Sequence, residues 1–139
     1  MTAHSPQRRH PFLEIFARAL APHMLHGHSH DKDPPPVEQL LPPGFSQPEL
    51  QAVLELFIAA DHDVREDRFT AAALNLDLAE SRIRLAISKL VVVPPAMETA
   101  LYEIKTAQQE IVRKDTAHAL SAVDNAVRCL AATPPAAKR

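Results

Sequence analysis

The sequence predicts an all-α fold, a compact antiparallel bundle of three to four helices behind a flexible N-terminal segment rich in His and Pro. Eleven of the 13 prolines lie within the first 48 residues or at positions 134 and 135, and both glycines fall early. The stretch between is interrupted only by Pro94 and Pro95 and is rich in helix-favouring residues. With five Phe, one Tyr and no Trp, the core must be built mainly from aliphatic side chains, as in closely packed helices.

Length and proline distribution indicate one folded unit with a tail at each end. A chain of 139 residues has material for a single hydrophobic core. We expect residues 46–132 to form the bundle and residues 133–139 to form a disordered tail. Residues 1–45 are expected to be flexible, with one short amphipathic helix at about residues 11–21 and a His- and Pro-rich linker behind it.

The first core helix is predicted to begin near Gln47. Ser46 and Glu49 have the spacing of a capping box, in which each side chain bonds the other residue's backbone N–H. Pro48 is tolerated in the first turn of a helix. The apolar residues that follow repeat with helical spacing on one face, namely Leu50, Val53, Leu54, Phe57 and Ile58.

We expect the chain to turn at Asp61-His62-Asp63, with Asp63 and Glu66 as the N-cap pair of a second helix that runs to about Val92. At about 100° per residue, this second helix has two opposite apolar faces. Both faces must be covered, either by the rest of the domain or by another copy of the protein. One face holds Phe69, Leu76, Ile83, Ile87 and Leu90, and the other holds Leu74, Leu78, Leu85 and Val92.

Val93-Pro94-Pro95 predicts a tight reversal, because a residue before proline is displaced from the α region and Pro95 suits a first helical turn. Downstream, two apolar stripes are rotated by roughly 100° from each other when drawn on one continuous helix. We therefore expect a break between Arg113 and Thr116, with Asp115 as N-cap. The alternative is one long helix whose halves contact different partners. The stripes are Met97, Leu101, Ile104 and Ile111, and then Leu120, Val123, Val127 and Leu130.

A cluster of histidines in the N-terminal segment is the first candidate site. Four histidines lie within eight positions and are followed by two carboxylates. Imidazole is a common ligand of Zn, Ni and Cu(II), and a flexible segment can bring several rings around one ion. The segment has no Cys pair and no helical His pair, so a solvated linker is the competing interpretation. The candidate metal ligands are His23, His26, His28, His30, Asp31 and Asp33.

Two further histidines lie in the predicted bundle. His62 stands between two aspartates, which are more often helix caps around an exposed turn histidine than metal ligands. The stretch Thr-Ala-His-Ala-Leu-Ser-Ala around His118 resembles the phosphorylated helix of histidine phosphotransfer domains, which are small helical bundles. That family has a Lys and a Gly shortly after the histidine, where this chain has Ser121 and Ala122. We therefore expect His118 to be a surface or half-buried helical residue.

The predicted N-terminal helix is the second candidate site. Phe12, Ile15, Phe16 and Leu20 lie on one helical face ahead of the linker. A short amphipathic helix on a tether is a common element for docking into the groove of a partner protein. The alternative is that this helix folds back and covers the outer face of the second core helix.

Composition and motifs argue against several classes of function. A formal net charge of -2 argues against nucleic acid as a partner. The sequence has no Gly-rich phosphate loop, nucleophile elbow or Cys pair, so we expect no enzymatic activity. No apolar run is long enough to span a membrane as a helix. The residues after Arg8 and Arg9 include Glu14 and Arg18 and make a poor export signal, so we expect a cytoplasmic protein.

Two functions of different classes fit these features. The first is a small accessory protein that binds or delivers Ni, Zn or Cu through the His-rich segment. The second is a helical adaptor or scaffold that docks a protein partner through the Phe12 to Leu20 helix. Self-association is a further expectation, because the second core helix has two apolar faces.

Overall fold

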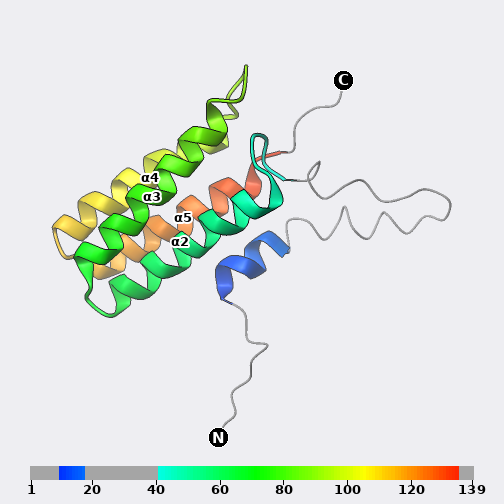
Figure 1. The fold of residues 1–139 in the computed structure, drawn as a ribbon. Coiled ribbons are helices and arrows are strands. Elements are labelled where there is room, and N and C mark those ends of the chain that lie inside the picture. Colours follow the sequence, from blue (N-terminus) through cyan, green and yellow to red (C-terminus); the bar gives the residue numbers. More distant parts are fainter. Residues whose placement is uncertain (1–9, 18–40, 135–139) are drawn as a thin grey trace, which may run out of the picture.

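A computed structural model describes residues 10–17 and 41–134 of the chain. All regular secondary structure in these ranges is helical (Figure 1), which confirms the predicted all-α class. A short helix over residues 11–17, called the N-terminal helix below, precedes four long ones. The described ranges therefore hold five helices. The long helices are α2 (Gln47–Arg65), α3 (Phe69–Ile87), α4 (Pro95–Val112) and α5 (Thr116–Ala132).

The four long helices lie side by side, and successive helices run in opposite directions (Figure 1). Each packs on the next along the chain, and α5 packs back on α2, so the four surround a common core. None of the helices in the described ranges combines the length and apolar character that crossing a membrane requires. Large buried side chains fill the core and buried alanines line the closest helix contacts. The large ones include Phe57, Leu76, Ile83, Met97, Ile104 and Leu130, and the alanines include Ala72, Ala79, Ala100, Ala107, Ala119 and Ala126.

The start of α2 confirms the predicted capping box. The backbone N–H of Ser46 donates to the Glu49 carboxylate at 2.9 Å, and the Ser46 hydroxyl accepts from the Glu49 N–H at 3.3 Å. Gly44, just before, has a positive φ of 88° and lies against the backbone carbonyl of Ala86 near the end of α3. A Cβ at Gly44 would overlap that carbonyl, so only glycine allows this close approach.

The predicted turn at Asp61-His62-Asp63 is wrong, because α2 continues through these residues to Arg65. The chain turns instead at residues 66–68, where Asp67 adopts a positive φ of 62°. The predicted N-cap pair of Asp63 and Glu66 therefore does not form, and α3 begins after Arg68 without a side-chain cap.

Asp61 and Asp63 are buried in the last turns of α2 because other segments supply partners for their carboxylates. Asp63 accepts hydrogen bonds from Arg68 Nε at 3.1 Å and from Asn75 Nδ2 at 2.8 Å. Asp61 accepts one from Arg65 Nε on α2 itself at 3.0 Å, and its Oδ2 also lies 3.3 Å from Nε2 of His10. A buried carboxylate is tolerated when it is paired in this way, and local sequence patterns do not reveal distant partners such as His10 and Asn75.

The second core helix corresponds to α3 and differs from its prediction in two respects. It ends at Ile87 and not near Val92. Its inner face is buried, but its outer face is uncovered in the described ranges, because α2 and α4 flank it and the N-terminal helix lies elsewhere. The outer residues Leu74, Leu78, Leu85 and Val92 are all exposed.

The predicted break between α4 and α5 is confirmed, and the alternative of one long helix is excluded. The chain reverses at residues 113–115, with a positive φ of 61° at Lys114. Asp115 is the N-cap of α5, and its carboxylate accepts the backbone N–H of His118 at 3.1 Å.

The N-terminal helix packs beside α2 (Figure 1) and contributes to the core. Phe12 and Phe16 are only 3% and 6% exposed. His10 links the two helices, because its Nδ1 accepts the Phe12 N–H at 3.1 Å and its Nε2 lies 3.3 Å from Asp61 Oδ2.

The first 45 residues, predicted to be flexible, thus reach the core at two places. Leu41 and Phe45 are buried there in addition to the N-terminal helix. Residues 1–9, 18–40 and 135–139 lie outside the described ranges. At the other end, Thr133 is buried, although the disordered tail was predicted to begin there.

We predict that Phe12→Ala lowers the free energy of unfolding by about 1–3 kcal/mol. A large-to-small substitution in a core costs about 3–5 kcal/mol, and release of the short helix limits the loss here. Glu14→Ala on the exposed side of the same helix is the control and should stay within about 0.5 kcal/mol of the parent protein. Urea denaturation followed by circular dichroism measures both. Equal stability of the two variants would contradict a core role for the N-terminal helix.

Candidate functional site

The candidate metal ligands of the N-terminal segment lie outside the described residues. This applies to His23, His26, His28, His30, Asp31 and Asp33. Their proposed role as ligands therefore stays a prediction from the sequence.

The candidate partner-binding residues are engaged within the chain where the structure describes them. Phe12 and Phe16 belong to the core cluster, and Ile15 is half-buried against it. Leu20 lies outside the described residues. The apolar face of the N-terminal helix thus packs on its own bundle, which is the alternative weighed in the sequence analysis. It packs beside α2, however, and not on the outer face of α3.

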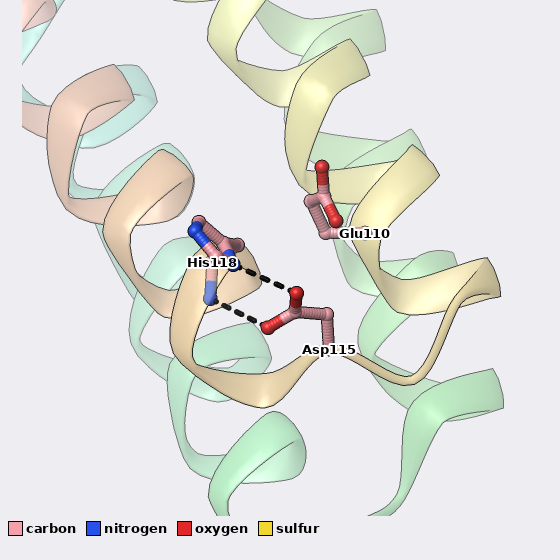
Figure 2. A group of neighbouring side chains, drawn as sticks. All are labelled: Glu110, Asp115 and His118. Atoms are coloured by element: carbon pink, nitrogen blue, oxygen red, sulfur yellow. Dashed lines mark hydrogen bonds and ion pairs between the residues drawn. The ribbon is translucent and has the colours of Figure 1, made fainter.

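One group of side chains in the described ranges has the spacing of metal ligands, and Figure 2 shows it at the turn between α4 and α5. Glu110 projects from the last turns of α4, Asp115 caps α5 and His118 lies in its first turn. One potential ligand atom from each lies within 4.8 Å of the others. Glu110 and Asp115 are half-buried, and the His118 side chain is 74% exposed.

Hydrogen bonds within this group shift the pKa values of two members. Asp115 accepts the backbone N–H and the imidazole N–H of His118, and these bonds hold the pKa of the Asp115 carboxyl below its ordinary value. The side-chain hydrogen bond, 2.7 Å from His118 Nδ1 to Asp115 Oδ2, and the carboxylate charge raise the pKa of His118. The charged pair is thus favoured in the folded state.

Two carboxylates and one imidazole suit Zn, Ni or Cu(II), with water completing the coordination at an exposed position. The ligands already have protein partners, however. Arg113 Nη1 lies 3.4 Å from the Glu110 carboxylate, and the imidazole N–H of His118 donates to Asp115. A metal ion would have to displace both, so helix capping alone also accounts for this group.

Sequence reasoning identified Asp115 as a cap and noted His118, but it did not include Glu110. The three residues stand on both sides of a helix break, and the reversal of the chain brings them together. Spacing along the sequence predicts neighbours on one helix and does not show which residues meet across such a reversal.

The outer face of α3 is a second candidate site in the described ranges, because packing within the bundle leaves its leucines exposed. Leu74, Leu78 and Leu85 are 59%, 47% and 59% exposed. Beside them, a shallow groove of about 260 Å³ runs between α2 and α3, with Leu56 and Leu78 among its lining residues.

The one cysteine of the chain lies on α5. Cys129 lies half-buried on α5, and burial raises the pKa of its thiol. A thiol with a raised pKa is a poor nucleophile at neutral pH.

We predict that Asp115→Asn lowers the pKa of His118 toward its ordinary value, as measured by an NMR titration of the imidazole. Asparagine retains the N-cap but removes the negative charge. Unchanged backbone amide shifts in α5 would show that the cap is intact. An unchanged midpoint would contradict the contact between the two side chains.

The same pair sets a pH window for stability. The pKa of His118 is higher in the folded state than in the unfolded state. Its contribution to the free energy of unfolding is therefore fully present below the unfolded-state pKa and is lost as the pH rises through the folded-state pKa. The pKa of Asp115 is lower in the folded state than in the unfolded state. Its contribution to the free energy of unfolding is therefore fully present above the unfolded-state pKa and is lost as the pH falls through the folded-state pKa.

Comparison of the chain with protein-family models, curated proteins and solved structures found no match. Inference about its function therefore starts from the geometry of its own residues.

Proposed function

We propose that the protein is a non-enzymatic adaptor that binds another protein through the outer face of α3. The observation that carries this proposal is the line of three exposed leucines, Leu74, Leu78 and Leu85. Single exposed leucines are ordinary, but three on one face of one helix form a patch of the kind that marks protein interfaces.

Covering the outer face of α3 with a partner would be favourable, because it would remove apolar surface from water. Full burial of one leucine side chain contributes about 1.5–3 kcal/mol relative to leaving it exposed. The groove beside Leu78 adds apolar surface from the half-buried Leu56 and Ala52, and its other lining residues are the exposed Glu55 and Arg82. An apolar centre with a charged border is the usual anatomy of a protein interface.

The N-terminal helix is a weaker candidate for the recognition element. Docking through Phe12 or Phe16 would first require removing these side chains from the core, and that step costs the free energy of their burial. The outer face of α3 needs no such step because it is already exposed.

We predict that a photoreactive amino acid at position 78 cross-links to a defined protein in cells that make this chain. The product should disappear when Leu74 and Leu85 are also changed to Glu, because charge on the face opposes its burial. Electrophoresis and mass spectrometry identify the product.

The matched control is the same photoreactive group at position 112. Val112 is 82% exposed at the end of α4, so it is more accessible than Leu78 but does not belong to the α3 face. The same product from both positions, or none from position 78, would contradict the proposal.

Transition-metal binding is a second proposed function, and a specific observation favours it. Glu110, Asp115 and His118 supply a carboxylate and imidazole set within 4.8 Å, in a chain whose N-terminal segment carries four clustered histidines. The histidines of the N-terminal segment would collect the ion, and the group at the α4–α5 turn would hold it on the bundle.

We predict stoichiometric binding of one of Ni(II), Zn(II) or Cu(II) in calorimetric titration of the tag-free protein, with a dissociation constant below about 1 μM. Changing His23, His26, His28 and His30 to Ala should remove the binding that the N-terminal segment contributes. Asp115→Asn with His118→Ala tests the bundle site separately, and His62→Ala, on the exposed side of α2, is the control. Weak binding without preference among the ions would contradict this function.

A further inference from the structure

The outer face of α3 has the spacing of a seam that pairs with one other helix. Ala71, Leu74, Leu78, Ser81 and Leu85 follow one another in steps of three, four, three and four residues. Such alternation averages 3.5 residues, the repeat of two helices packed along each other, whereas a helix lying on a broad surface has a wider apolar stripe. Leu74, Leu78, Ser81 and Leu85 are exposed, so the seam is open to a partner.

Charged residues border this seam on both sides. Asp77 and Arg84 lie on the α4 side, where Asp77 accepts a hydrogen bond from Gln108 and Arg84 pairs with Glu80. Arg82 lies on the α2 side, at the rim of the groove next to Leu78. Asp77, Arg82 and Arg84 are exposed and remain accessible to a second helix.

The seam complements itself in an antiparallel alignment. When two copies of α3 are related by a two-fold axis between residues 79 and 80, Leu74 of one copy stands opposite Leu85 of the other, and Leu78 stands opposite Ser81. The same alignment sets Asp77 of each copy near Arg84 of the other, which makes two opposite-charge contacts.

A parallel alignment is less favourable. It would place Asp77 near Arg82 of the other copy, but it would also place Arg84 near Lys89, just beyond the end of α3. The like-charge contacts would offset the opposite-charge contacts, whereas the antiparallel alignment brings only opposite charges together. The charges of α3 thus complement those of a second copy of the chain, and they favour the antiparallel direction.

We infer that the outer face of α3 binds the same face of a second copy of this chain, antiparallel, with Leu74 opposite Leu85 and Asp77 near Arg84. This inference rests on the proposed function, in which the α3 face is the binding surface. The leucines supply the buried area, and the two charge contacts fix the register.

Sedimentation equilibrium of the full chain and five variants tests the inference. Asp77→Arg and Arg84→Asp should each weaken the dimer by about tenfold, because each creates two like-charge contacts. The double variant reverses both partners and should restore the dissociation constant to within about threefold. Leu78→Glu should abolish the dimer, and Val112→Glu, off the face, should not change it. Thermal melting confirms that each variant is folded.

The outcomes separate this inference from the proposed function. Restoration in the double variant supports pairing in the stated register. A wild-type chain that stays monomeric overturns the inference, and cross-linking from position 78 to a different protein then leaves the proposed function standing. A dimer that none of the α3 substitutions changes overturns the inference, because another surface holds it. A monomer without cross-links from position 78 overturns both.

Discussion

Burial of one aliphatic stripe from each long helix is the interaction on which the rest of this structure depends. Alanines at the contacts, such as Ala79, Ala107 and Ala122, let the helix axes approach, and larger side chains such as Phe57 and Ile104 fill the space between them. Because each long helix buries its aliphatic stripe in the core, the directions in which its other faces point are also determined. The second apolar stripe of α3 is left on the outside, because α2 and α4 occupy its flanks.

Carboxylates near the helix ends position the turns around this core. Asp63 accepts hydrogen bonds from Arg68, at the end of the α2–α3 turn, and from Asn75 on α3. Asp61 pairs with Arg65 and also contacts His10, so the N-terminal helix is held by a polar contact as well as by its two phenylalanines. Buried carboxylates would be costly if unpaired, and in the described ranges no buried side-chain polar atom lacks a partner.

The two candidate surfaces differ in whether their side chains already have partners within the chain. The polar group at the α4–α5 turn is already engaged, since Asp115 caps α5 and bonds His118, and Glu110 faces Arg113. A metal ion would replace existing interactions there. The leucines on α3 have no comparable covering in the described ranges, so a protein partner would add burial without displacing anything. This difference is why binding through α3 is the better supported of the two proposed functions.

The sequence by itself determined the helical class, the capping box at Ser46, the start of α4 at Pro95 and the N-cap at Asp115, because each depends on residues a few positions apart. The reversal before α4 spans residues 88–94 and is not the tight turn predicted at Val93-Pro94-Pro95. It also revealed the two apolar faces of α3. Tertiary structure alone decided which of them is covered, and it brought Phe12 into the core and Glu110 beside His118. It also decided that α2 continues through Asp61 and Asp63. These outcomes depend on contacts between distant parts of the chain. Helical spacing does not indicate which distant segment packs against a given helix face.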